Sequence, residues 1–220
     1  MITKEEQIID ILKINDAYWI HDGNPKHPHA QLSNNQCSNA YFNLSNVLCY
    51  PDINERFART LCSKLIEAGL EEEYPEWVIS SSYAAITFGY EVARQLGAKY
   101  AFAEKDCSKG FNFKRWKISR NTPVLQIEEL ITSLNTAKLV REAVRRDNEY
   151  KVNFLPIIGT IIFRPNTFLD KYFIEKDQVK IVSLIEKEVW STVPELCPLC
   201  KKGSKRYRPK ENWEKLNRRG

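Results

Sequence analysis

The sequence predicts an α/β protein with a mainly parallel central sheet and helices on both faces of that sheet. Short apolar runs typical of strands alternate with longer amphipathic segments typical of helices. Two turns that follow strands, at residues 80–82 and 132–136, are rich in hydroxyl side chains. The composition, 43% hydrophobic and 28% charged, is typical of globular proteins. A chain of 220 residues therefore suggests one domain with appendages.

The N-terminal part begins with a predicted helix over 3–14, where Thr3 and Glu6 form a capping box. No apolar run approaches the roughly 18 residues of a membrane span, and the first residues are too acidic for a signal peptide. We therefore expect a cytoplasmic protein without a membrane segment. Residues 23–29 form a loop, in or beside which all the histidines lie. These histidines are His21, His27 and His29. A polar surface loop is favoured there over a metal site, because no further strong ligand is nearby in the sequence.

The next segments alternate between strands and helices. Residues 38–47 predict one or two strands. A capping box of Asp52 and Glu55 opens a helix that stops at Gly69. A buried strand over 77–80, a helix over 83–96 and a strand over 98–103 follow.

Residues 104–122 break the periodicity with a charged segment that contains three aromatic side chains. It is either a functional loop or a solvated hairpin whose aromatic cluster packs on the core. Its cationic residues are Lys105, Lys109, Lys114, Arg115, Lys117 and Arg120.

The chain is organised around residues 124–136, where a buried strand runs into Glu128 and Glu129, then into a hydroxyl-rich turn and a helix over 137–147. Ligands of open α/β sheets bind beyond the carboxyl ends of strands. A helix N-terminus offers free N–H groups to an anion. A sugar phosphate suits this combination, although two acids ahead of a helix can also simply complement its dipole. An apolar run over 153–163 predicts a buried strand or strand pair, and 179–185 predicts a last edge strand.

The central stretch resembles the signature of type I phosphoribosyltransferases, in which a strand leads into two acids and a phosphate loop. Three further segments resemble orotate phosphoribosyltransferases in the same order along the chain. Residues 78–97 resemble the diphosphate loop and its helix, 102–106 the entry to a mobile lysine loop, and 32–43 the N-terminal substrate segment.

This resemblance implies transfer of ribose 5-phosphate from phosphoribosyl diphosphate to a nitrogenous base, with orotate as the first guess. It implies Mg²⁺ bound with the diphosphate and a homodimer. Glu128 and Glu129 would hold the ribose hydroxyls, and Lys105 and Lys109 would face the leaving group. The remaining implied contacts are Ser80, Ser81 and Ser82 to diphosphate, Thr132, Ser133, Leu134, Asn135 and Thr136 to the 5-phosphate, and Tyr41 and Phe42 to the base.

The sequence also departs from the family pattern, mostly by losing glycine or charge. Leu134 replaces the first glycine of the phosphate loop, where a side chain is expected to need positive φ and to crowd the phosphate. Ala84 and Ala85 replace a frequent glycine pair, Cys37 replaces Lys or His, and Asn39 replaces an acid. Two functions are therefore open: an active transferase, or a degenerate relative that binds a nucleotide or acts as a regulator.

The division expected from the sequence is a domain over 1–195, with a substrate segment 1–50 and a core 51–195, and a tail over 196–220. The tail carries nine Lys or Arg and two Glu in residues 201–220, so the excess positive charge is local. Nucleic-acid binding through this tail, with Tyr207 and Trp213, is an alternative to a solvated end. Cys197 and Cys200 form a single CxxC motif. A zinc site within one chain is disfavoured, because the sequence shows no second pair of ligands. The alternatives are one zinc ion shared by the two copies of a dimer and, favoured over it, a surface turn with two reduced thiols.

Overall fold

A computed structural model describes residues 4–70, 73–107, 110–148 and 150–217. The chain divides into two compact units, each formed by separated stretches of sequence. The first unit comprises Met1–Val47, Pro165–Phe168 and Lys187–Gly220. The second comprises Leu48–Arg164 and Leu169–Glu186. The predicted boundary at 195/196 thus differs from this division, which joins the C-terminal tail to the N-terminal segment.

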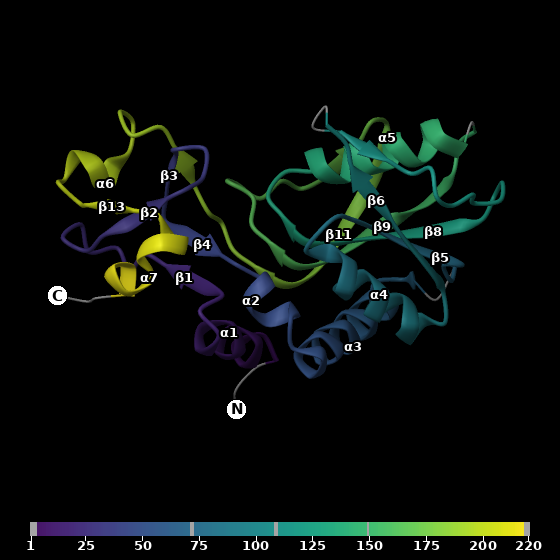
Figure 1. The fold of residues 1–220 in the computed structure, drawn as a ribbon, viewed down its shortest axis with the longest axis horizontal. Helices are drawn as coiled ribbons and strands as arrows, with labels where there is room; N and C mark the ends of the chain where they lie inside the picture. The colour runs from purple at the N-terminus through teal and green to yellow at the C-terminus, as the bar shows by residue number, and fades with distance from the viewer. Residues whose placement is uncertain (1–3, 71–72, 108–109, 149, 218–220) are drawn as a thin grey trace. The chain divides into compact units, whose positions relative to one another are not determined.

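A seven-stranded sheet forms the centre of the second unit (Figure 1). Its five inner strands are parallel, and a short antiparallel strand closes each edge, which confirms the predicted sheet. The prediction that 179–185 is the edge is wrong, because a further strand pairs outside it. The order is β10 (Tyr172–Ile174), β11 (Asp177–Glu186), β9 (Asn153–Phe163), β8 (Pro123–Ile131), β5 (Trp77–Ser81), β6 (Lys99–Lys105) and β7 (Phe111–Asn112).

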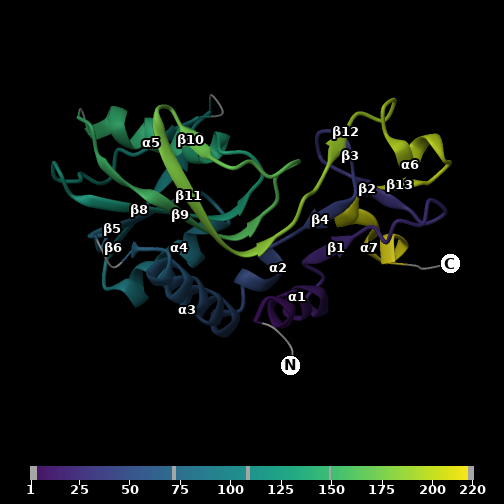
Figure 2. The same ribbon diagram turned by 180° about the vertical axis from the view of Figure 1, so that it is seen from behind.

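Helices cover both faces of this sheet, as predicted. Helices α3 (Pro51–Glu67) and α4 (Ala85–Leu96) lie on one face, and α5 (Asn135–Asn148) lies on the other (Figures 1 and 2). The predicted capping box at the start of α3 is wrong. The helix begins at Pro51, whose fixed φ suits the first helical position, and its N-cap Tyr50 makes no side-chain capping bond.

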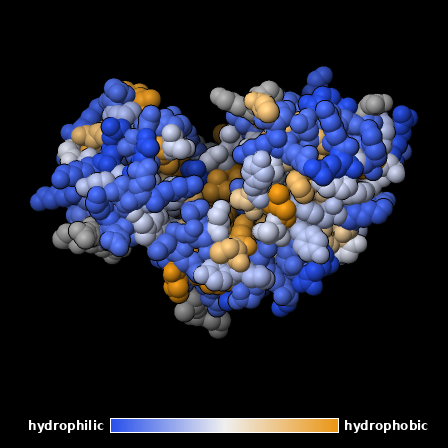
Figure 3. Space-filling view, in the orientation of Figure 1, coloured by the Kyte–Doolittle hydropathy of each residue, from blue (hydrophilic) through white to orange (hydrophobic). Residues whose placement is uncertain are grey.

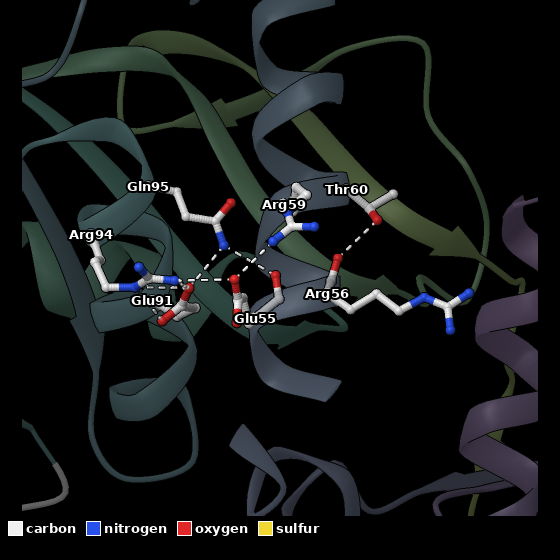
Figure 4. A network of polar contacts seen from close by, with 7 residues as sticks. All are labelled: Glu55, Arg56, Arg59, Thr60, Glu91, Arg94 and Gln95. Carbon is white, nitrogen blue, oxygen red and sulfur yellow. Dashed lines mark hydrogen bonds and ion pairs between the residues drawn. The ribbon is translucent and has the colours of Figure 1, made fainter. Parts of the chain in front are cut away.

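A polar network joins α3 to α4 on the solvent side (Figure 4). The Gln95 amide on α4 donates to the Glu55 carbonyl on α3 at 3.0 Å and to Glu91 at 2.8 Å. Arg94 pairs with Glu91 at 2.6 Å and reaches Glu55 at 3.4 Å. Exposed pairs of this kind contribute about 0–1 kcal/mol each, so the network orients the helices more than it stabilises them.

The charged segment over 104–122 packs an aromatic cluster on the core, as one of its two interpretations predicted. Strand β6 continues to Lys105, and β7 pairs with it antiparallel. Phe111, Phe113 and Ile118 are buried beside α5, and Trp116 packs against them. Much of the segment is therefore fixed to the sheet. Lys109 lies outside the described residues.

The first unit joins both ends of the chain. It contains α1 (Lys4–Ile14), which the sequence predicted, although the capping residue Thr3 lies outside the described residues. Strand β1 (Tyr18–Ile20) pairs with β4 (Ala40–Phe42), and α2 (Ser45–Leu48) follows where a strand was expected. A second sheet has the order β12 (Ser191–Thr192), β3 (Cys37–Ser38), β2 (His29–Gln31) and β13 (Arg206–Tyr207), with α6 (Pro198–Lys201) and α7 (Pro209–Asn217) beside it.

The aromatic residues of the tail belong to the interior of this unit. Tyr207 and Trp213 pack against a cluster of Trp19, Ala30 and Leu216. The Trp213 indole N–H also donates to Asp16 at 2.6 Å. These two rings are therefore partly buried in the packing of this unit, and nucleic-acid binding through the tail stays an untested alternative.

The face of the molecule in Figure 3 is mainly hydrophilic, with apolar side chains in small separate groups. Within the described residues, no helix combines the length and hydrophobicity needed to cross a membrane.

Gly89 sets the distance between α4 and the sheet. A Cβ at this position would lie 2.8 Å from Tyr100 Cε2 and 3.0 Å from Ser80 Cβ. We predict that Gly89→Ala lowers the free energy of unfolding by about 1–3 kcal/mol through overpacking, although alanine normally favours a helix. Urea unfolding followed by circular dichroism measures the change. Thr87→Ala, at an exposed position of the same helix, is the control and should change stability by less than about 0.5 kcal/mol.

Candidate active site

The sheet changes winding direction between β5 and β8. From β5 the chain crosses through α4 to β6 on one side, whereas from β8 it crosses through α5 to β9 on the other. The two crossover helices lie on opposite faces of the sheet (Figure 1). Ligands of open α/β sheets bind beyond the strand ends at such a switch point. The segments 80–82, 105, 128–129 and 132–136 lie at or just beyond the carboxyl ends of the neighbouring parallel strands β5, β6 and β8.

The three serines at the end of β5 are buried and hydrogen-bonded to protein groups. Ser80 shares a hydrogen bond of 2.7 Å with the Tyr100 hydroxyl. Ser81 donates to Glu128 at 2.5 Å, and Ser82 accepts from the Lys105 backbone N–H at 3.0 Å. Their hydroxyls hold the ends of β5, β6 and β8 in place, so the contact to diphosphate stays a prediction.

Glu128 is buried, and its side-chain hydrogen bonds are not predictable from the sequence pattern. Its carboxyl group accepts from Ser81 and from the Gln126 amide at 2.9 Å. Gln126 in turn accepts from Arg141 Nε at 2.9 Å. Burial raises the pKa of Glu128 to about 8, with a further rise from the Glu129 charge, while the bonds from Ser81 and Gln126 lower it. Glu128 is thus an acid that can hold a proton near neutral pH.

Gln126 and Arg141 could have been suspected from their positions in the sequence. Gln126 interrupts the apolar run of β8, and Arg141 lies on the face of α5 that carries Ala137 and Val144. The Arg141 guanidinium stacks 4.7 Å from the centre of the Phe154 ring, and burial lowers its pKa to about 10. A polar residue within an apolar pattern indicates that its side chain has a buried partner, but the pattern does not predict which residue that partner is.

Glu129 projects to the side of β8 opposite Glu128, because successive strand residues alternate. Its side chain is half-buried. Burial raises its pKa, and the nearby Lys105 ammonium lowers it. The Lys105 Nζ also lies 5.6 Å from the centre of the Tyr83 ring. An acid and a cation therefore approach one another at this edge of the sheet. The roles expected for them, at the ribose hydroxyls and at the leaving group, stay predictions.

The turn after β8 leaves its polar side chains exposed: Thr132, Ser133, Asn135 and Thr136. Helix α5 begins at Asn135 and has no acid in its first turn, so no carboxylate of that turn competes with an anion for the N-terminal N–H groups. The expectation for Leu134 is wrong in both respects. Leu134 does not have a positive φ, and its side chain packs against the cluster that contains Ile131, Phe163 and Ile174.

The alanines that replace the glycine pair have ordinary helical geometry. Ala84 has φ −67° and ψ −28° and is the N-cap of α4, where no side chain caps the helix. Ala85 is buried at the first helical position. The N–H groups at this end of α4 therefore have no side-chain capping partner. The preceding Ser82–Tyr83 peptide bond is cis.

The predicted base-binding residues lie in the first unit. Tyr41 packs in the cluster with Tyr207 and Trp213, and burial raises its pKa. Phe42 packs edge-to-face against Tyr18, with 5.2 Å between the ring centroids. Their contact to a base stays a prediction, as does the role of Lys109.

Comparisons with known proteins agree with this geometry, although no family model matches the chain. Two structures share the fold with a TM-score of 0.56. One is an orotate phosphoribosyltransferase from Mycobacterium tuberculosis, 12% identical, covering 84% of this chain and 96% of that one. The other is an adenine phosphoribosyltransferase, 14% identical, covering 83% and 100% respectively. The fold is that of the type I phosphoribosyltransferases.

Sequence similarity narrows this class. The orotate phosphoribosyltransferase of Pelotomaculum thermopropionicum is 30% identical over 181 residues, which cover 82% of this chain and 87% of the relative. The chain belongs to the orotate phosphoribosyltransferase family.

The raised pKa of Glu128 predicts a pH-dependent stability. The folded protein keeps a proton that the unfolded chain releases, since the ordinary pKa is 4.5 and the folded value is about 8. Stability should therefore fall as pH rises from about 5 to 9, by up to several kcal/mol at about 1.4 kcal/mol per pKa unit. Glu128→Gln removes this titration, so its free energy of unfolding should fall less over the same range.

Chemical denaturation of both proteins at pH 5, 7 and 9 measures this difference. Glu67→Gln, at an exposed position at the end of α3, is the control and should follow the wild-type pH dependence. Parallel curves for wild type and Glu128→Gln would show that Glu128 is not protonated in the folded protein.

Proposed function

We propose that the protein transfers ribose 5-phosphate from phosphoribosyl diphosphate to a ring nitrogen of orotate and releases diphosphate. One observation carries this proposal: an acid, an exposed hydroxyl turn and a free helix N-terminus follow one another at the switch point of the sheet. The named relative at 30% identity supports orotate as the base.

The 5-phosphate binds in the turn 132–136. The exposed hydroxyl and amide side chains of this turn donate hydrogen bonds to its oxygens, and the N-terminus of α5 adds N–H groups and a favourable dipole. Leu134 directs its side chain into the apolar cluster beneath, which leaves the phosphate side of the turn open.

Glu129 is the acid that accepts from the ribose hydroxyls, because its side chain is only half-buried. Glu128 is buried and positions the site. It binds Ser81 at the end of β5, and it binds the Gln126 amide, which also donates to the Ala137 carbonyl near the start of α5.

The diphosphate lies toward the N-terminus of α4 and the Lys105 ammonium, which stabilise the negative charge that develops on the leaving group. Since the serine hydroxyls are occupied, the backbone N–H groups at the start of α4 supply the contacts there. Mg²⁺ bound with the diphosphate would neutralise part of the diphosphate charge. Glu129 is a separate feature of the site, as its half-buried carboxylate.

A degenerate relative that binds the nucleotide without turnover is the second candidate. Its support is the loss of glycines at Leu134, Ala84 and Ala85 and the exchange of a cation for Cys37. The first three changes are weaker support for this candidate, because Leu134, Ala84 and Ala85 have regular backbone geometry and Leu134 packs against an apolar cluster. A cytoplasmic homodimer without nucleic-acid binding remains a prediction.

Isothermal titration with phosphoribosyl diphosphate and Mg²⁺, followed by a diphosphate-release assay with a panel of bases, separates these functions. We expect binding, and release that depends on orotate. Binding without release for any base would establish the degenerate relative. No heat and no thermal shift at millimolar ligand would exclude both.

The acid pair gives a sharper test of how the site binds. We predict that Glu129→Ala weakens binding of phosphoribosyl diphosphate by about 10–100-fold, since a hydrogen bond to a charged group contributes about 1.5–3 kcal/mol. Glu128→Ala should also weaken it, through loss of the Ser81 and Gln126 contacts. Titration of each variant measures the affinity, with Glu67→Ala as an exposed control. Unchanged affinity in the double variant would show that the ribose lies elsewhere.

A further inference from the structure

Four potential metal ligands meet where the two ends of the chain pair in the first unit. His29 lies in β2 and Cys37 in β3, whereas Cys197 caps α6 and Cys200 lies within it. The expectation that the CxxC pair lacks two further ligands is wrong, because the fold supplies them from about 160 residues earlier. The expectation that the histidine loop is a polar surface is also wrong for His29, which is fully buried.

The distances between the ligand atoms match those around a tetrahedral zinc ion. Cys37 Sγ lies 3.6 Å from Cys200 Sγ, and His29 Nε2 lies 3.6 Å from Cys197 Sγ and 3.4 Å from Cys200 Sγ. All four atoms lie within 4.8 Å of one another. Zn–S bonds of about 2.3 Å and Zn–N bonds of about 2.0–2.1 Å at tetrahedral angles place two sulfurs about 3.8 Å apart and sulfur about 3.6 Å from nitrogen.

These distances do not describe a disulfide. A disulfide bond is about 2.05 Å long, and the cysteines are free thiols in the structure. Cys37 and Cys197 are fully buried, and Trp190 and Leu199 pack around them. A buried group of three sulfurs and an imidazole gains little from such weak hydrogen bonds, whereas a metal ion would satisfy every member.

The hydrogen bonds of Ser204 fix the His29 ring in the form that binds metal. The Ser204 hydroxyl donates its one proton to the His27 carbonyl at 2.6 Å. It must therefore accept from His29 Nδ1–H at 2.8 Å. This leaves the lone pair on Nε2, the nitrogen that faces Cys197 and Cys200. Such a contact, which orients a ligating histidine, is typical of metal sites.

The chain around the cysteine pair forms a tight turn suited to presenting both sulfurs to one ion. The Cys200 backbone N–H points to Cys197 Sγ at 3.4 Å, a contact that stabilises a thiolate. Gly203 has φ +82°, which lets the chain reverse so that Ser204 reaches His29. The turn and the histidine support thus belong to one local structure.

We propose that His29, Cys37, Cys197 and Cys200 bind one Zn²⁺ ion in a closed structural site that fastens the C-terminal segment to the N-terminal segment. Three thiolates and an imidazole in tetrahedral arrangement select zinc over the harder ions. Four protein ligands leave no open position, so the ion stabilises the fold and takes no part in catalysis. This role explains Cys37, the residue that replaces a charged side chain of the family pattern.

Zinc content measured by mass spectrometry on the full chain, purified without chelator, tests the proposal. We expect one zinc per chain in the wild type and in Cys107→Ser, which changes an exposed cysteine. Cys37→Ser and Cys197→Ser should each retain less than a tenth of that zinc. Removal of zinc by a chelator should lower the Tm by about 5 °C or more and zinc should restore it, because metal binding is coupled to folding.

Cobalt substitution of the wild-type protein keeps the test independent of whether the variants fold. Co²⁺ in a tetrahedral site with three thiolates should give intense visible absorption, with thiolate-to-metal charge transfer, that zinc then displaces. Full zinc content in both Cys37→Ser and Cys197→Ser would overturn the proposal. So would a wild-type chain that holds no metal and takes up neither zinc nor cobalt. None of these measurements depends on transferase activity.

Discussion

The hydrogen bond from Ser81 to Glu128 joins β5 to β8 where the sheet changes direction. The rest of the site depends on this contact, because it holds together two strand ends whose following helices leave on opposite faces. Gln126 and Arg141 extend it into the core and toward α5. A buried polar chain is stabilising only when every member has a partner, which here restricts the strands to one register. The same burial raises the pKa of Glu128, whereas Glu129, the next residue along β8, is only half-buried.

The turn 132–136, proposed above to bind the 5-phosphate, has a leucine where the family pattern has a glycine. In glycine-rich loops the backbone adopts positive φ and lies close to the phosphate. In this protein Leu134 has a regular backbone and turns its side chain into the apolar cluster below β9, so the polar residues on either side stay exposed. Ala84 and Ala85 are accommodated in the same way, as the first residues of a regular helix. The side chains that stand in place of glycine therefore fit a regular backbone, and the N-termini of α4 and α5 carry no acid in their first turns.

Fold and sequence carry different information about the substrate. The structural neighbours include an orotate and an adenine phosphoribosyltransferase with equal TM-scores, so the fold does not distinguish between the two bases. The choice of orotate comes from sequence similarity over most of the chain. The first unit, where the base-binding residues are expected, also contains the cluster of His29, Cys37, Cys197 and Cys200. Cys37 of this cluster lies in β3, and the chain passes from β3 through Asn39 into β4, the strand that carries Tyr41 and Phe42.

The sequence by itself determined the mainly parallel sheet, most of its helices and the position of the acid pair. These features follow from local periodicity and from the chain order of strand, turn and helix, which a linear pattern records. It failed at Leu134, at the edge strand β10 and at His29, whose environments depend on residues distant in the chain. Only the tertiary structure could decide that Gln126 and Arg141 support Glu128, and that Cys197 and Cys200 meet His29 and Cys37. The physical reason is that burial and ligand distances are properties of packed strands, and no spacing in the sequence fixes which distant segments pack together.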